Sequence, residues 1–167
     1  MAMPETPNPD SPRSFAGRCL RECAALTDAL KATLRTERRA LEQRDQNALD
    51  SALESKRDCI ARLHEADPRK RLADQAGEGL PTPEGLEAHL RTLDQDGTLA
   101  GSWRALQALT LECKELNERN GLLSTRLRNR AEQTLLLLHA AAGEETPTPV
   151  YGPDGALSST IGQLPRR

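Results

Sequence analysis

Aromatic and β-branched aliphatic residues are almost absent from this sequence. Its 167 residues include one Phe, one Trp and one Tyr, and Ile60, Val150 and Ile161 are its only β-branched aliphatic residues. Because strands are built largely from these residue types, a β-rich fold is excluded. Leu and Ala carry most of the apolar content, and with Glu, Arg, Lys and Gln they favour helices. The composition therefore predicts an all-α bundle with a thin, leucine-based core.

Long apolar runs and a charge excess are also missing. No run reaches the roughly 18 apolar residues of a membrane span, so no membrane insertion is expected. The N-terminus has three prolines in its first ten residues and no apolar core, unlike a secretory signal. The net charge of −2 gives no general electrostatic case for binding nucleic acid or an anionic membrane. We therefore expect a cytoplasmic protein.

Signatures of catalysis are absent as well. There is no GxGxxG, P-loop or HExxH motif, and His64, His89 and His139 are scattered. Neither an enzyme nor a cofactor is expected, although a helical metalloenzyme that uses these histidines and the cysteines is the rival from the catalytic class.

The four cysteines, Cys19, Cys23, Cys59 and Cys113, form no CxxC pair. A reducing compartment argues against disulfides, and small buried side chains are the simplest role for them. A zinc site remains the alternative, although structural zinc usually shows closer ligand spacing.

Proline and capping residues divide the chain. Ser11-Pro12, Asp45 and Thr82-Pro83 are helix starts, and apolar residues at three-and-four spacing continue each helix. Glu37 and Lys56 interrupt two of the apolar stripes. We expect a disordered segment 1–11, a bundle over 12–142 and a flexible tail over 143–167. Its elongated, coiled-coil-like bundle of long antiparallel helices should place helices at about 12–43, 45–66, 83–95 and 98–142, with one small helix in the 68–97 connection.

The predicted helices differ in length. At 1.5 Å per residue, the last is roughly 65 Å long, the first roughly 45 Å and the second roughly 30 Å. The two shorter helices cannot cover the whole of the last, so part of its apolar stripe should be exposed or bind a partner. A homodimer that pairs the stripe with its own copy is the alternative.

Polar residues interrupt that stripe at one place, which reads Leu116-Asn117-Glu118-Arg119-Asn120-Gly121. Asn on an apolar stripe costs stability but can fix helix register or bind a partner's backbone. Gly in mid-helix costs about 1 kcal/mol relative to Ala, which suggests close approach or bending. A register-setting Asn pair inside the bundle is the other interpretation.

The tail holds the only tyrosine, in the turn-forming run Tyr151-Gly152-Pro153-Asp154-Gly155. A single aromatic residue in such a tail is typical of a docking motif, because Tyr offers a large contact area at low entropic cost. A chance Tyr in a disordered end is the alternative.

The two motifs together, LNERNG at 116–121 and YGPDG at 151–155, resemble the FlgN family of flagellar export chaperones. The resemblance covers roughly 14–157 and implies long antiparallel helices. It implies that the chain binds the C-terminal segments of the hook-associated, hook–filament junction proteins FlgK and FlgL, and that it docks on the cytoplasmic domain of the export gate protein FlhA. The 68–97 connection is longer than the family pattern.

From the resemblance and the apolar stripe, we expect client binding at Leu116, Asn117, Asn120, Gly121, Leu123 and Leu127. We expect docking on the export gate at Tyr151, Gly152, Asp154 and Gly155. The alternative is a generic helical adaptor or a self-associating coiled-coil protein with other partners. Neither role calls for nucleotide, metal or nucleic acid.

Overall fold

A computed structural model describes residues 11–77, 82–94 and 96–142, and the backbone of 150–151 and 157–158. The helices in it are α1 (Pro12–Gln43), α2 (Gln46–Glu65), α3 (Pro68–Ala76), α4 (Pro83–Leu93) and α5 (Thr98–Ala141). The prediction of an all-α fold is confirmed. The chain divides into two units, Met1–Leu123 and Ser124–Arg167, which are described separately below. Segment 1–10, expected to be disordered, lies outside the described residues.

Side chains that cap the first turn fix where three of the helices begin. Ser11 Oγ accepts a hydrogen bond from the Ser14 N–H at 3.2 Å, before Pro12 at the first helical position. Asp45 Oδ1 accepts from the Ala48 N–H at 3.0 Å. Thr82 Oγ1 likewise accepts from the Gly85 N–H at 3.1 Å. Each cap satisfies a backbone donor that has no partner inside its helix, so these residues set the helix starts.

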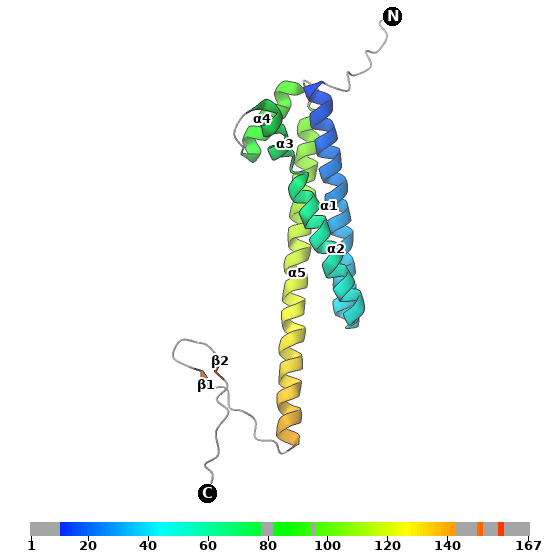
Figure 1. Cartoon of the computed structure of the whole chain (residues 1–167), viewed down its shortest axis with the longest axis vertical. Coiled ribbons are helices and arrows are strands. Elements are labelled where there is room, and N and C mark those ends of the chain that lie inside the picture. The colour runs from blue at the N-terminus through cyan, green and yellow to red at the C-terminus, as the bar shows by residue number, and fades with distance from the viewer. Residues whose placement is uncertain (1–10, 78–81, 95, 143–149, 152–156, 159–167) are drawn as a thin grey trace, which may run out of the picture. The chain divides into compact units, whose positions relative to one another are not determined.

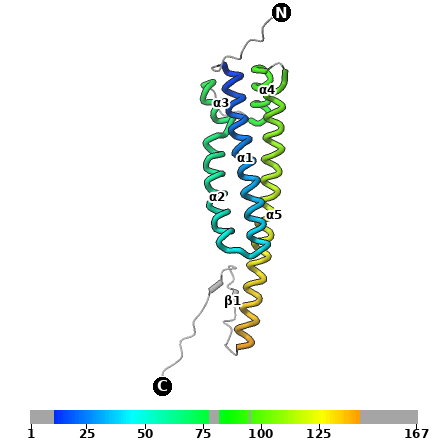
Figure 2. The backbone as a smooth tube through the Cα atoms, turned by 90° about the vertical axis from the view of Figure 1, so that its right-hand side faces the viewer, coloured from blue at the N-terminus to red at the C-terminus, as the bar shows by residue number. Residues whose placement is uncertain are grey.

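Within the first unit, α1, α2 and the N-terminal part of α5 lie side by side (Figures 1 and 2). α2 runs antiparallel to α1, because Glu37 late in α1 meets Lys56 in α2. α5 runs parallel to α1, because Lys31 pairs with Glu112 and Leu34 with Asn120. α2 and the connection through α3 and α4 together return the chain to the starting end of α1, where Arg13 pairs with Asp94 just before α5. This return makes the parallel pairing of α1 and α5 possible.

The main apolar core of this unit lies where α3 and α4 meet the N-terminal parts of α1 and α5. Its buried members are Ala16, Leu20, Cys23, Leu72, Leu86, Leu90, Leu99, Trp103 and Leu106. Gly17 of α1 packs beside Leu99 of α5, and a Cβ there would lie 3.6 Å from Leu99 Cδ2, an ordinary contact distance. Burial of several leucines and a tryptophan stabilises this end of the unit.

The second unit contains α5 from Ser124 to Ala141 and a pair of two-residue strands, β1 (Val150–Tyr151) and β2 (Leu157–Ser158). The strands are antiparallel, with Val150 opposite Ser158 and Tyr151 opposite Leu157. This pairing was not expected from the sequence, which showed only turn-forming residues there. The rest of the predicted tail, 143–149, 152–156 and 159–167, lies outside the described residues.

Candidate protein-binding surfaces

Asn120, the second asparagine of the motif at 116–121 in α5, forms hydrogen bonds inside the bundle. Asn120 is 1% exposed, and its Nδ2 donates to the Leu34 carbonyl at 2.8 Å and to Glu37 Oε2 at 2.9 Å. Glu37 in turn accepts from Lys56 Nζ at 3.0 Å. This buried network joins α1, α2 and α5 at one level. Asn120, which was expected to bind a client, is therefore buried, and both of its amide donors are bound to its own chain.

The other residues expected to bind a client are more accessible. Asn117 and Gly121 are exposed, while Leu116, Leu123 and Leu127 are half-buried. The two asparagines therefore do not form a buried pair, since only Asn120 faces α1. A Cβ added at Gly121 would meet nothing within 4 Å, so no close approach within this chain requires the glycine.

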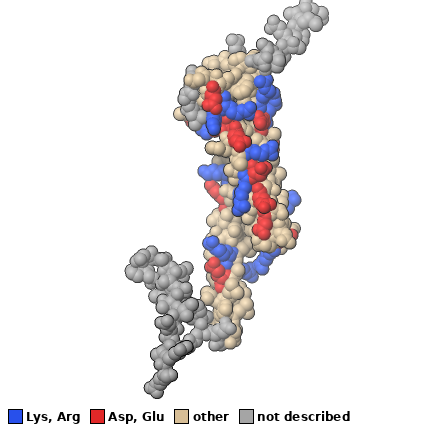
Figure 3. All heavy atoms as spheres, viewed as in Figure 1, with Lys and Arg blue, Asp and Glu red and all other residues tan. Residues whose placement is uncertain are grey.

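The largest exposed apolar side chains of the second unit are four consecutive leucines near the end of α5. Leu135, Leu136, Leu137 and Leu138 are 55%, 53%, 73% and 61% exposed. Figure 3 shows the C-terminal end of α5 as a mostly uncharged surface. At about 100° per residue, four successive leucines point to all sides of a helix. We call Leu127 with Leu135, Leu136, Leu137 and Leu138 the leucine surface; apolar clusters of this kind on soluble proteins mark interaction sites.

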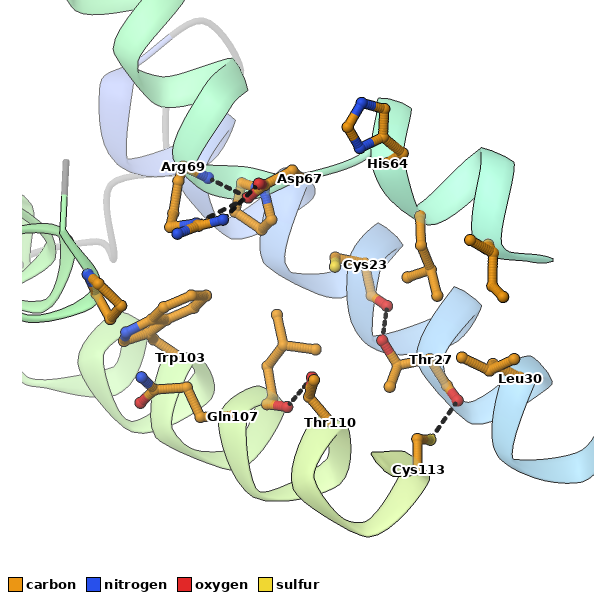
Figure 4. A pocket seen from close by; sticks show the side chains of 15 residues that line it. Cys23, Thr27, Leu30, His64, Asp67, Arg69, Trp103, Gln107, Thr110 and Cys113 are labelled. Atoms are coloured by element: carbon orange, nitrogen blue, oxygen red, sulfur yellow. Dashed lines mark hydrogen bonds and ion pairs between the residues drawn. The ribbon is translucent and has the colours of Figure 1, made fainter. Parts of the chain in front are cut away.

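A second apolar feature belongs to the first unit, where a groove of about 500 Å³ opens between α1, α2 and α5 (Figure 4). Cys23, Thr27 and Leu30 line it from α1, and Ile60 and Leu63 line it from α2. The α5 side consists of Trp103, Leu106, Gln107, Thr110 and Cys113. The Trp103 N–H is buried and has no hydrogen-bond partner within the part of the chain that is described. A shallow, mainly apolar groove of this kind suits an apolar side chain of a partner better than a polar substrate.

The cysteines are all buried and none forms a disulfide. Burial raises the pKa of the Cys19, Cys23 and Cys113 thiols. The Cys113 thiol donates to the Thr27 carbonyl at 3.6 Å, and the Thr27 hydroxyl donates to the Cys23 carbonyl at 2.7 Å. Buried, protonated thiols suit packing rather than nucleophilic chemistry. Among the described residues no group of three His, Cys, Asp or Glu side chains is arranged to hold a metal ion.

Of the residues expected to dock on the export gate, only the backbone of Tyr151 is described, in β1. Gly152, Asp154 and Gly155 lie outside the described residues, between the two strands. The Tyr151 backbone pairs with Leu157 of β2. In the described helices, none is long and apolar enough to cross a membrane.

A helical bundle with exposed leucines on its long helix is the architecture of a protein that binds other protein chains. The sequence model of the FlgN protein family matches residues 17–159. The chain therefore belongs to the FlgN family, whose members are flagellar export chaperones, and its general role is that of such a chaperone. Neither the curated proteins nor the solved structures contain a match to it.

Proposed function

We propose that this chain is the cytoplasmic chaperone of the hook-associated proteins FlgK and FlgL, that it prevents their premature assembly, and that it delivers them to the export gate protein FlhA. The observation that carries the proposal is the leucine surface, whose four consecutive leucines are each more than half exposed. Burying one leucine against a partner is worth about 1.5–3 kcal/mol. Binding there would keep the client's own apolar segment away from other copies of the client.

The client segment binds α5 as an amphipathic helix that lays its apolar face against a groove or stripe. The half-buried Leu123 extends the apolar path along α5 to Leu127, where the leucine surface begins. Leu116, Asn117 and Gly121 border that path in this proposal. Asn120 contributes indirectly, because its hydrogen bonds to Leu34 and Glu37 fix the position of α5 against α1.

Calorimetry with the full chain and the C-terminal segment of FlgK tests the client part of the proposal. Leu138→Asp places a charge in the leucine surface and should weaken binding at least about tenfold, since a buried unpaired charge is costly. Leu111→Asp is the matched control, because Leu111 is a 56% exposed leucine of the same helix outside the leucine surface. Equal affinity of both variants and the unaltered chain would remove the leucine surface as the client site.

The gate part of the proposal rests on the tail, where Tyr151 with Gly152, Asp154 and Gly155 forms the docking motif. A tethered tail presents this motif at high local concentration once the client is bound. Tyr151→Ala should weaken binding to the cytoplasmic domain of FlhA and leave binding of the FlgK segment unchanged. If affinity for the gate domain does not change, Tyr151 is not the docking residue.

A further inference from the structure

Basic residues flank the apolar stripe in the exposed part of α5. Residues 124–142 contain three arginines, Arg126, Arg128 and Arg130, and a single carboxylate, Glu132. All three arginines are exposed. The Arg128 Nε lies 3.8 Å from Glu132 Oε1, whereas Arg126 and Arg130 form no ion pair with any described residue. The exposed segment is therefore positively charged, although the whole chain carries a net charge of −2.

The helix period places these arginines along both edges of the apolar stripe. With about 100° per residue, Leu127, Ala131, Leu135 and Leu138 fall on one face. Arg130 then lies along one edge of that face and Arg128 along the other, while Arg126 lies on the same side as Arg130, about 40° farther round the helix. Long arginine side chains at the edges of an apolar stripe reach across to the flanks of a helix that binds there, as charged residues do in coiled coils.

We propose that the partner of this surface is an acidic amphipathic helix of another protein, with a leucine-type apolar stripe flanked by Asp or Glu on both sides. This proposal rests on the proposed function, and it adds the charge that the client helix must carry. Opposite charges at the edges of an interface speed association and fix the register of the two helices. Arginine suits this role because its planar group can hold a carboxylate through two hydrogen bonds.

Charge argues against a second copy of this chain as the occupant of the surface. A second copy would bring its own arginine excess and only one carboxylate per segment, so like charges would oppose pairing. An anionic membrane would attract the arginines as a carboxylate does, so membership of a family of export chaperones is what favours a protein partner over a membrane.

The test uses the full chain and two synthetic helical peptides with the same leucine stripe, one with Glu flanks and one with Lys flanks. Fluorescence anisotropy should show the Glu peptide binding about tenfold more tightly in 50 mM salt, the sum of a few surface ion pairs. In about 300 mM salt the advantage should fall to roughly twofold, because exposed charges are screened. Equal affinity of both peptides at low salt would overturn the proposal.

A pair of double variants separates local from general charge effects. Arg126→Glu with Arg130→Glu should reverse the preference, so that the Lys peptide binds more tightly. Arg39→Glu with Arg57→Glu makes the same change in net charge at exposed residues of α1 and α2, and should leave the preference in place. If both double variants change the preference equally, the effect is one of net charge, and the proposal fails.

Three further measurements distinguish this proposal from the others. If the FlgK segment binds with the same affinity to the unaltered chain and to the Arg126→Glu, Arg130→Glu variant, the proposal of an acidic partner fails while the proposed function stands. If the FlgK segment does not bind the unaltered chain but the Glu peptide does, the proposed function fails while the proposal of an acidic partner stands. If the chain binds vesicles of anionic lipid more tightly than the Glu peptide, the surface belongs to a membrane and the proposal is overturned. If light scattering shows dimers that Leu138→Asp dissociates, the surface belongs to a second copy of the chain and the proposal is likewise overturned.

Discussion

Asn120 of α5 donates a hydrogen bond to Glu37 of α1, with 2.9 Å between Nδ2 and Oε2, although the two residues are 83 positions apart. The same amide donates to the Leu34 carbonyl at 2.8 Å, and Lys56 of α2 neutralises the Glu37 carboxylate. The Asn120 side chain thus fixes α5 against α1 directly, and Glu37 links this contact to α2 through Lys56. A shift of α5 by one turn, about 5.4 Å, would break both hydrogen bonds at once.

Loss of the Asn120 amide should destabilise the bundle. Asn120→Ala removes two buried hydrogen bonds and leaves the Leu34 carbonyl and one Glu37 oxygen with fewer donors, at a cost of about 2 kcal/mol in the free energy of unfolding. Asn117→Ala, three residues earlier and exposed, should change it by less than about 0.5 kcal/mol. Urea unfolding followed by circular dichroism measures both. Equal effects would mean that the network does not hold the helices together.

Removal of the Lys56 charge should cost more than removal of an exposed lysine. Lys56→Met leaves the Glu37 carboxylate, 8% exposed, without its counter-charge, and the cost should be about 3 kcal/mol. Lys114→Met breaks an exposed pair with Glu118 at 4.0 Å and should cost less than about 0.5 kcal/mol.

The double variant Lys56→Met with Glu37→Leu checks the cause. Replacing a buried ion pair by apolar side chains is often neutral, so stability should largely return apart from the lost Asn120 bond. If the double variant is as unstable as Lys56→Met alone, an unpaired carboxylate is not the reason.

The helix starts and the fold class could be predicted from local features of the sequence. Ser11, Asp45 and Thr82 mark helix starts because short polar side chains satisfy backbone donors that the helix leaves free. The all-α class follows from the near absence of strand formers. The strand pair of the tail is the exception, because two-residue strands have no periodicity to detect.

The candidate binding surfaces were harder to predict from the sequence, because their exposure depends on which helix covers which. Glu37 and Lys56 each interrupt an apolar stripe, and they form an ion pair in the structure. The interruptions indicated that both charges needed a partner, but local sequence patterns do not show which residues of two different helices come together. Asn117 and Asn120 lie on nearly the same face, and only the packing of α1 decides that Asn120 is the buried one. The exposure of Leu136 and Leu137 likewise depends on what the rest of the chain covers.

The buried thiols should make stability fall at high pH. Burial raises the pKa of Cys19, Cys23 and Cys113, so the folded state binds their protons more tightly than the unfolded chain does. Their contribution is complete below the pKa of an unfolded thiol, about 8.5, and is lost as pH rises toward the higher pKa of the folded state. Between pH 7 and pH 10 the free energy of unfolding should therefore drop more in the unaltered chain than in the triple Cys→Ala variant. A drop of equal size in both would assign the pH dependence to other groups.

Gly121 gives a way to separate a structural from a binding role. Neither Gly121 nor Gly101, both within α5, would place a new Cβ within 4 Å of another atom. Both Gly→Ala variants should therefore raise the free energy of unfolding by about 0.5–1 kcal/mol, because Ala loses less backbone entropy in a helix. If a client backbone approaches α5 closely at Gly121, at the border of the proposed client path, Gly121→Ala should weaken binding of the FlgK segment, while Gly101→Ala should not. If both variants are stabilised and both bind the FlgK segment with unchanged affinity, the client binds elsewhere on α5. The motif at 116–121 would then have only the structural role of Asn120.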